Sequence, residues 1–231
     1  MVMRSISLMN ALKQRFGLSQ ETLKLIACLT MLLDHIGVIL IQSTGLRIVG
    51  RISFPIFCFL LVEGVYHTSN PRKYGTRLLI SVFLSELAYD LARFGQWNWQ
   101  KNSVMITLFL GFVALSVIKS KNSILLKVLL VCGVLVAARF LGGDYGWFGV
   151  IVILMFGLTR RLPFRNLIQL ACLLLLFVLY KGGIASYAVF AIIPIALYSG
   201  KKVTSSKAAQ WAFYLFYPVH LLVLYFIGLL V

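Results

Sequence analysis

The sequence MLLDHIG at positions 31–37 places Asp34 directly before His35 inside a long apolar run. The run extends from Leu23 to Ile41, and a membrane-spanning helix needs about 20 residues at about 1.5 Å each. An ionisable side chain at mid-membrane costs about 2.5 to 3.5 kcal/mol on insertion scales, so such groups usually face the protein interior or a water-filled cavity. The stretch therefore predicts a membrane helix and marks its Asp-His pair as a candidate functional site.

The composition is typical of an integral membrane protein. Hydrophobic residues make up 61% of the 231 residues and the mean hydropathy is +0.95, whereas soluble domains are about 45 to 50% apolar. The chain has 22 lysines and arginines against six acids. These basic residues lie between the apolar runs, as in loops that flank membrane spans. We therefore expect a lipid bilayer around the protein and no nucleic acid partner.

The apolar runs predict an all-α polytopic membrane protein with about nine transmembrane helices. The candidate spans are 22–43, 52–68, 75–93, 103–118, 123–141, 146–158, 167–181, 184–199 and 209–230. The fourth, sixth and eighth are short and are candidates for re-entrant or half-length helices. If every span alternates, most basic residues fall on the side of the N-terminus, which predicts a cytoplasmic N-terminus and an outer C-terminus.

Two regions are predicted along the chain. Residues 1–18 carry apolar side chains at helical spacing among basic ones, which is typical of a short amphipathic helix on the membrane surface. Residues 19–231 form the transmembrane domain. Ser19 is the expected N-cap of the first span, with Glu21 in its first turn.

Several acidic residues lie within apolar segments, where each is costly. Glu86 and Asp90 are four residues apart and share a helix face, and the predicted topology places them in the outer half of the bundle. The same half is predicted to hold Asp34, His35, Arg47, Arg51, Arg139 and Asp144, and His220 falls near the centre of the last span.

These charges also allow a structural interpretation, as buried ion pairs that join helices. The candidate pairs are Arg47 or Arg51 with Glu86 or Asp90, and Arg139 with Asp144. Two adjacent carboxylates would raise the pKa of one of them unless an arginine lay between them.

Two histidines lie near an acid on the same predicted helix, His67 near Glu63 and His35 beside Asp34. Glu63 and His67 are four residues apart, and we expect them to form a hydrogen-bonded pair towards the cytoplasmic side. Adjacent residues point about 100° apart on a helix, so His35 faces a different groove from Asp34. This arrangement is harder to explain as structure and favours a catalytic or relay role for His35.

No metal site is predicted. The cysteines show no metal-ligand spacing and no pairing pattern, so we expect them to be buried hydrophobic residues. They are Cys28, Cys58, Cys132 and Cys172.

The motifs in order along the chain resemble the TraX family of membrane proteins. The matching stretches are LKLIA at 23–27, MLLDHIG at 31–37, RIVGRISFPIF at 47–57, LVEG at 61–64 with HT at 67–68, SE at 85–86 with Asp90, Thr107 with Gly111, DYG at 144–146 and FYLFYPVHL at 213–221. The Asp-His, Gly-Arg-x-x-Phe-Pro and Tyr-Pro-x-His stretches are the specific parts of this resemblance.

The resemblance implies a membrane-embedded acyltransferase. The namesake of the family acetylates the N-terminus of a pilin, and related transmembrane acyltransferases use a membrane histidine to deliver an acyl group from cytoplasmic acyl-CoA. The implied co-substrate is acetyl-CoA or another acyl-CoA. The implied acceptor is a pilin-like peptide or an envelope saccharide or lipid at the outer face of a bacterial cytoplasmic membrane.

Acyl transfer needs a base for the acceptor and a donor for the oxyanion. His35 would be the base, polarised by Asp34 or by a carboxylate of another helix such as Glu86. The catalytic group predicted from this chemistry is His35, Asp34, Glu86, Asp90 and His220. Candidates for stabilising the oxyanion or positioning the substrate are Arg47, Arg51, Glu63, Tyr217, Asp144 and Tyr145. Candidates for binding the CoA phosphates are Arg72, Lys73 and Arg77, or Arg160, Arg161 and Arg165.

Two other functions fit the same residues. A proton-coupled transporter would use Asp34, His35, Glu86 and Asp90 as a relay. A non-catalytic assembly factor would need the buried charges only for folding.

Overall fold

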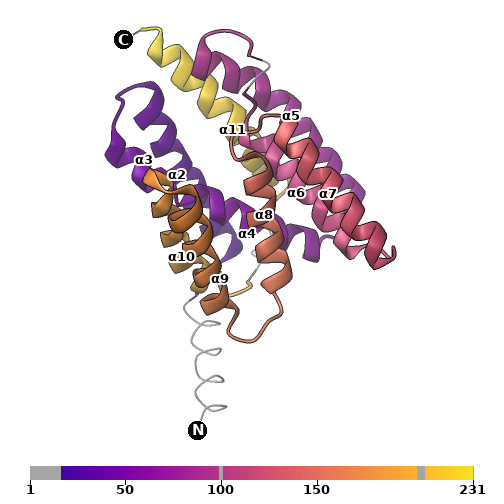
Figure 1. Ribbon diagram of the computed structural model, residues 1–231. Coiled ribbons are helices and arrows are strands. Elements are labelled where there is room, and N and C mark those ends of the chain that lie inside the picture. Colours follow the sequence, from indigo (N-terminus) through magenta and orange to yellow (C-terminus); the bar gives the residue numbers. More distant parts are fainter. Residues whose placement is uncertain (1–16, 99–100, 202–205, 231) are drawn as a thin grey trace.

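The computed structural model describes residues 17–98, 101–201 and 206–230 (Figure 1). The predicted amphipathic helix at 1–18 therefore falls almost entirely outside the described residues. The helices of the described chain are α2 (Gln20–Ile39), α3 (Thr44–Gly50), α4 (Ser53–His67), α5 (Pro71–Phe94), α6 (Val104–Lys119), α7 (Ile124–Phe140), α8 (Gly146–Thr159), α9 (Arg165–Leu173), the π-helix η1 (Leu174–Lys181), the 3₁₀-helix η2 (Gly183–Ala191), α10 (Ile192–Ala196) and α11 (Lys207–Gly228).

The predicted all-helical class is confirmed for the described part of the chain. Three helical segments are long and apolar enough to cross a membrane: Gln20–Ile39, Thr44–His67 and Ala208–Gly228. Shorter apolar helices cover Val104–Lys119, Gly146–Thr159 and Gly183–Ala196, where the three short spans were expected. The number of crossings and the orientation in the membrane stay predictions.

The start of α2 follows the predicted capping pattern. The Ser19 hydroxyl accepts a hydrogen bond from the backbone N–H of Thr22 at 3.1 Å, and Glu21 lies in the first turn. This cap satisfies one of the free N–H groups at the helix start. It fixes where α2 begins relative to Asp34 and His35.

Residues 44–50 form a separate short helix, α3, which the apolar pattern did not predict. Ser43 caps α3, and α3 folds back against the C-terminal half of α2. Two glycines permit this close approach. A Cβ atom on Gly37 would lie 2.9 Å from Ser43 O, and one on Gly50 would lie 2.7 Å from Asp34 Cα. The packing of α3 brings Arg47 of this helix and Arg51, which follows it, to the cavity that Asp34 and His35 line.

Two predicted spans are irregular helices. The segment predicted at 167–181 divides into α9 and the π-helix η1, and that at 184–199 divides into η2 and α10. Gly182 and Gly183 separate them with φ angles of 66° and 57°, a backbone region that glycine adopts without steric cost. Pro194 lies within α10, where it removes a helical N–H donor.

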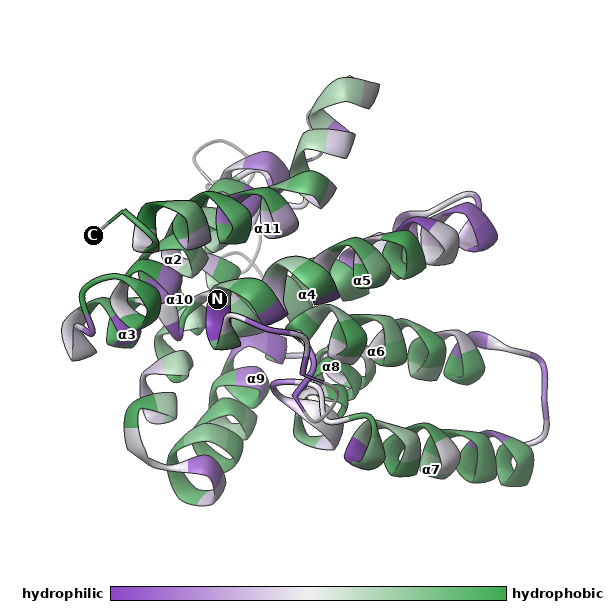
Figure 2. Ribbon diagram, turned by 90° about the horizontal axis from the view of Figure 1, so that it is seen from above, coloured by the Kyte–Doolittle hydropathy of each residue, from purple (hydrophilic) through white to green (hydrophobic). Residues whose placement is uncertain are grey.

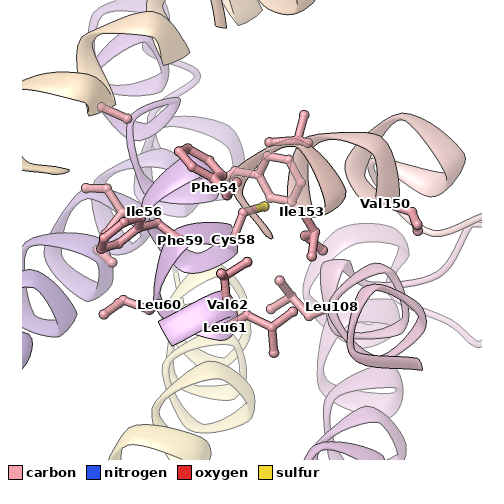
Figure 3. Close-up of a cluster of buried hydrophobic side chains, with 14 of the residues drawn as sticks. Phe54, Ile56, Cys58, Phe59, Leu60, Leu61, Val62, Leu108, Val150 and Ile153 are labelled. Atoms are coloured by element: carbon pink, nitrogen blue, oxygen red, sulfur yellow. The ribbon is translucent and has the colours of Figure 1, made fainter. Parts of the chain in front are cut away.

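Helix α4 lies at the centre of the bundle. Its buried side chains Phe54, Cys58 and Val62 lie on the side of α6 and α8, where Leu108 and Ile153 lie, and Ile56 lies on the opposite side (Figure 3). By contrast, α7 lies at the edge beside α6 and α8 (Figures 1 and 2) and buries little of its apolar surface. An apolar face turned outwards is expected where lipid is the solvent.

Candidate functional site

Two imidazole side chains from opposite ends of the sequence meet in the bundle. His35 Nδ1 of α2 lies 2.7 Å from His220 Nε2 of α11, and the rings are stacked with centroids 5.0 Å apart. The other ring nitrogen of His220, Nδ1, lies 2.6 Å from the backbone carbonyl oxygen of Phe216. A carbonyl oxygen can only accept a hydrogen bond.

This chain of contacts fixes the tautomer of both neutral rings. His220 Nδ1 donates to the carbonyl, so His220 Nε2 carries a lone pair and accepts from His35 Nδ1–H. His35 Nε2 is then the unprotonated nitrogen, as a general base requires. The group that orients His35 is therefore a second histidine, and not the carboxylate that was expected.

Asp34 has a different partner from its neighbour. The guanidinium of Arg51 forms an ion pair with Asp34 and donates a second hydrogen bond, at 3.3 Å, to the hydroxyl of Tyr145. The Tyr145 ring is stacked on Phe54 with centroids 3.5 Å apart. The expected pairing of Arg51 with Glu86 or Asp90 is thus wrong, because the close packing of α3 against α2 brings Arg51 to Asp34.

A small polar cavity of about 60 Å³ contains this Asp-His pair. Its charged and polar lining residues are Asp34, His35, Arg47, Arg51, Tyr89, Arg93 and Asp144. Three polar atoms here are buried and make no hydrogen bond within the described structure: Asp34 Oδ1, Arg47 Nε and Arg51 Nε. Arg93 and Asp144 are exposed, so they lie at the mouth of this cavity, which we call the polar cavity.

The sequence did not single out Tyr89 or Arg93 as site residues. They are four residues apart on α5, and that spacing was the available signal. The expected ion pair between Arg139 and Asp144 is not among those of the described residues, since Arg139 is exposed and Asp144 faces the polar cavity.

Glu86 and Asp90 do not join the site. The Glu86 carboxylate accepts hydrogen bonds from the Ser103 hydroxyl at 2.6 Å and the Ser103 backbone N–H at 3.0 Å. Asp90 accepts from the backbone N–H of Asn98 at 3.1 Å. Glu86 therefore joins α5 to the N-cap residue of α6, Asp90 joins α5 to the loop that follows it, and neither side chain lines the polar cavity.

A larger cavity of about 220 Å³ approaches the imidazole pair from the other side. One wall is a stripe on α2 formed by Lys24, Cys28 and Met31, whose spacing continues to His35 on the same helix face. The facing wall on α11 includes Gln210, Phe213, Tyr214, Phe216 and Tyr217. We call this space the large cavity.

The large cavity reaches Tyr217, which lies next to the two histidines, although neither histidine lines it. The Tyr217 ring lines it and lies edge-on to His35, with centroids 6.0 Å apart, and to His220, at 5.6 Å. At the other end, Lys24 and Arg77 line the mouth, and Arg77 donates to Gln210 at 3.2 Å. The imidazole pair therefore lies between a polar cavity and a longer, mostly apolar one.

The predicted phosphate-binding residues divide into two groups. Arg77 lines the large cavity, whereas Arg72, Lys73 and Arg161 are exposed and do not line it. No group of three or more histidine, cysteine or acidic side chains that could hold a metal ion was found among the described residues.

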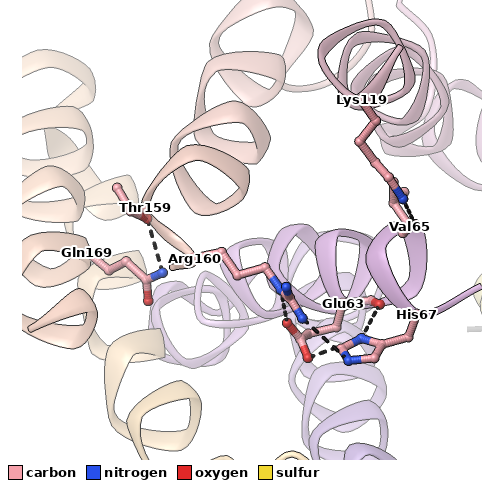
Figure 4. Close-up of polar contacts among 7 residues, drawn as sticks. All are labelled: Glu63, Val65, His67, Lys119, Thr159, Arg160 and Gln169. Atoms are coloured by element: carbon pink, nitrogen blue, oxygen red, sulfur yellow. Dashed lines mark hydrogen bonds and ion pairs between the residues drawn. The ribbon is translucent and has the colours of Figure 1, made fainter. Parts of the chain in front are cut away.

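Glu63 and His67 form a pair, as expected, but with an additional partner, Arg160. Arg160 Nε lies 2.9 Å from Glu63 Oε1, and His67 lies 3.6 Å from the same carboxylate (Figure 4). Lys119 donates to the carbonyl oxygen of Val65 at 2.7 Å. These cations stabilise the C-terminal end of α4, where helix carbonyls lack partners. Arg160 therefore forms an ion pair with Glu63. Glu63 lies near the C-terminal end of α4, whereas Arg51 lies just before the helix begins.

Comparison with known proteins gives one family. A model of the family described as "TraX protein" matches residues 19–228. The chain is 31% identical to the "Probable fimbrial assembly protein FimC, serogroup H1" of Dichelobacter nodosus, over 92% of this chain and 97% of that protein. An uncharacterized protein of Rickettsia prowazekii (strain Madrid E) is 33% identical over 40% of this chain and 34% of its own length. No solved structure matches. With these matches along nearly its whole length, the apolar chain that carries the Asp-His pair belongs to the TraX family.

Proposed function

We propose that the protein is a membrane acyltransferase that moves an acyl group from cytoplasmic acyl-CoA to an acceptor at the outer face of a bacterial cytoplasmic membrane. The observation that supports it most is the tautomer chain through His220 to His35, which leaves His35 Nε2 as a base. This base lies between two cavities of different polarity. Such a position suits a reaction between an acyl donor and an acceptor that arrive from opposite sides.

The large cavity suits the donor. Lys24 and Arg77 at its mouth supply charges for the CoA phosphates, and the apolar stripe through Cys28 and Met31 suits the pantetheine arm. His35 lies eleven residues after Lys24 on the same helix, which corresponds to about 16 Å. This is close to half of the hydrocarbon thickness of a bilayer, about 15 Å. A thioester at the end of the arm would therefore reach the imidazole pair.

The proposed chemistry is general-base catalysis. His35 Nε2 takes the proton from the acceptor hydroxyl or amine, whose oxygen or nitrogen attacks the thioester carbon. The tetrahedral intermediate then collapses, the carbon–sulfur bond breaks, and the CoA thiolate takes the proton from His35. Tyr217, which borders the large cavity beside both histidines, is the proposed oxyanion donor. His220 acts as a positioning residue for His35.

The acceptor follows from the family and the polar cavity together. The fimbrial assembly relative supports a pilin-like peptide, and an envelope saccharide or lipid is the alternative. A transporter relay receives less support, because Glu86 hydrogen-bonds to Ser103 and Asp90 to Asn98, and neither to His35.

The first test separates donor binding from transfer. His35→Ala in purified, liposome-reconstituted protein should retain acetyl-CoA binding, measured as a rise in unfolding temperature. It should lose transfer of labelled acetyl groups to an envelope fraction from a host that lacks the protein. Full transfer activity in this variant would rule out the mechanism, and an absence of acetyl-CoA binding to the wild type would rule out the function.

The second test concerns His220. Gln can place its amide oxygen where His220 Nε2 lies, and so can accept from His35, whereas Leu cannot. We expect His220→Leu to lower the transfer rate about 100-fold or more, and His220→Gln to restore part of that rate. Equal rates in the two variants would mean that His220 only fills space.

The third test uses a native thiol. Cys28 lines the large cavity, while Cys132 is exposed and lies outside it. Acetyl-CoA should slow the labelling of Cys28 by a small thiol reagent and leave the labelling of Cys132 unchanged. Equal labelling of Cys28 with and without acetyl-CoA would place the donor elsewhere.

A further inference from the structure

The charged residues that line the polar cavity and are not part of its ion pair carry a net positive charge. Arg51 and Asp34 neutralise each other. The remaining charged lining residues are Arg47, Arg93 and Asp144, and none of them takes part in an ion pair of the described residues. Two arginines and one aspartate around a small space favour an anion.

Two unpaired atoms indicate what else the occupant carries. Arg47 Nε and Asp34 Oδ1 are both buried without a hydrogen-bond partner in the described structure, although buried polar groups are nearly always satisfied. The Arg47 atom donates and the Asp34 atom accepts. A ligand that satisfies both presents an anionic oxygen to one and an O–H or N–H group to the other.

We propose that the acceptor carries a carboxylate or phosphate beside its reactive hydroxyl or amine, and that Arg47 and Arg93 bind this anion. This inference rests on the proposed function, because His35 in the same cavity is the base for the reactive group. A volume of about 60 Å³ holds only the reacting end of an acceptor. The rest extends past the exposed Arg93 and Asp144 at the mouth.

The test compares three small acceptors that share two hydroxyl groups: glycerol, glycerate and glycerol 3-phosphate. With acetyl-CoA and the reconstituted protein, CoA release should be about tenfold or more faster with an anionic acceptor than with glycerol. Whether glycerate or glycerol 3-phosphate is preferred identifies the anion as a carboxylate or a phosphate. Equal rates with all three in the wild type would overturn the proposal.

The arginines are tested by Arg47→Gln and Arg93→Gln, with Arg139→Gln as the matched control. Arg139 is an exposed arginine outside the polar cavity. The first two variants should lose the preference for the anionic acceptor, and the control should keep it. A preference that survives both substitutions would overturn the proposal. Because Arg93 is exposed, its variant is expected to fold even if Arg47→Gln does not.

A binding measurement separates this inference from the proposed function. Glycerol 3-phosphate or glycerate, but not glycerol, should raise the unfolding temperature of the wild type and of Arg139→Gln. It should not raise that of Arg47→Gln or Arg93→Gln, and an equal rise in all four proteins would overturn the anion site. If acetyl-CoA is neither bound nor turned over, the proposed function fails. The binding of glycerol 3-phosphate or glycerate then decides by itself whether the anion site exists.

Discussion

Gly50 holds α3 against α2 at the Asp-His pair, so its replacement by alanine tests how that contact supports the site. The added Cβ would lie 2.7 Å from both Asp34 Cα and Asp34 Oδ1. Because one of these atoms is backbone, a side-chain rotation cannot relieve the contact, and the two helices must move apart. Overpacking of this kind costs about 1 to 3 kcal/mol.

Gly45 provides the matched control on the same helix. Its added Cβ would meet only the Ser43 hydroxyl at 3.8 Å, which is an ordinary contact. Gly→Ala at a compatible helical position stabilises by about 0.4 to 1 kcal/mol, mainly through the unfolded state. For a chain of about this length, 1 kcal/mol corresponds to about 2 to 4 °C in unfolding temperature.

We therefore expect Gly50→Ala to lower the unfolding temperature by about 2 to 12 °C, and Gly45→Ala to leave it unchanged or raise it slightly. The assay is thermal unfolding of the purified proteins in the same detergent. Acyl transfer should also fall in Gly50→Ala alone, because a misplacement of about 1 Å can cost about 100-fold in rate. If the two variants unfold at the same temperature and have the same transfer rate, the close approach does not position the site.

Three further predictions concern contacts between helices, at Gly111, Glu86 and Tyr145. Gly111→Ala should lower the free energy of unfolding by about 1 to 3 kcal/mol. Adding Ile153→Val should restore part of this loss, because the substitution removes Ile153 Cδ1, the nearest neighbour of the added Cβ. Glu86→Gln should lower the free energy of unfolding by about 1 to 3 kcal/mol, because it weakens the hydrogen bonds to Ser103. Acetyl-CoA binding should be unchanged. A loss of transfer without a loss of stability would instead make Glu86 a catalytic residue. Tyr145→Phe keeps the stack on Phe54 and removes the hydroxyl that accepts a hydrogen bond from Arg51, so the free energy of unfolding should fall by about 1 kcal/mol. A fall as large as that of Tyr145→Ala would mean that the hydroxyl, and not the ring, provides the stability.

Features set by neighbouring residues could be predicted from the sequence. The cap at Ser19 and the short apolar helices followed from local residue order. The helix α3 could not be predicted, because seven residues, TGLRIVG at 44–50, are too few to show a period. Its position depends on the close approach at Gly50, which is a property of two helices and not of one.

The candidate site shows the same limit. The sequence named Asp34, His35, Arg51 and His220 individually, yet it gave the wrong partner for Arg51 and did not identify the bond between the two histidines, which are 185 residues apart. The contact of Glu86 with Ser103 could not be predicted, because an acid within an apolar run indicates burial but does not say which helix end it contacts. Pairing across a bundle depends on the rotation of each helix, which composition does not determine.

The adjacency of Asp34 and His35 has a geometric explanation in the bundle. Consecutive helical residues point about 100° apart, so Asp34 faces α3 and its Arg51, while His35 faces α11 and its His220. Both side chains still line the polar cavity, whose lining also includes Arg47 of α3 and Leu221 of α11. In the proposed reaction, one turn of α2 holds a charged group for the acceptor and a neutral base for its proton. Separating the two residues by one more position would turn one of them away from its partner, so the dipeptide is the shortest arrangement that serves both helix contacts.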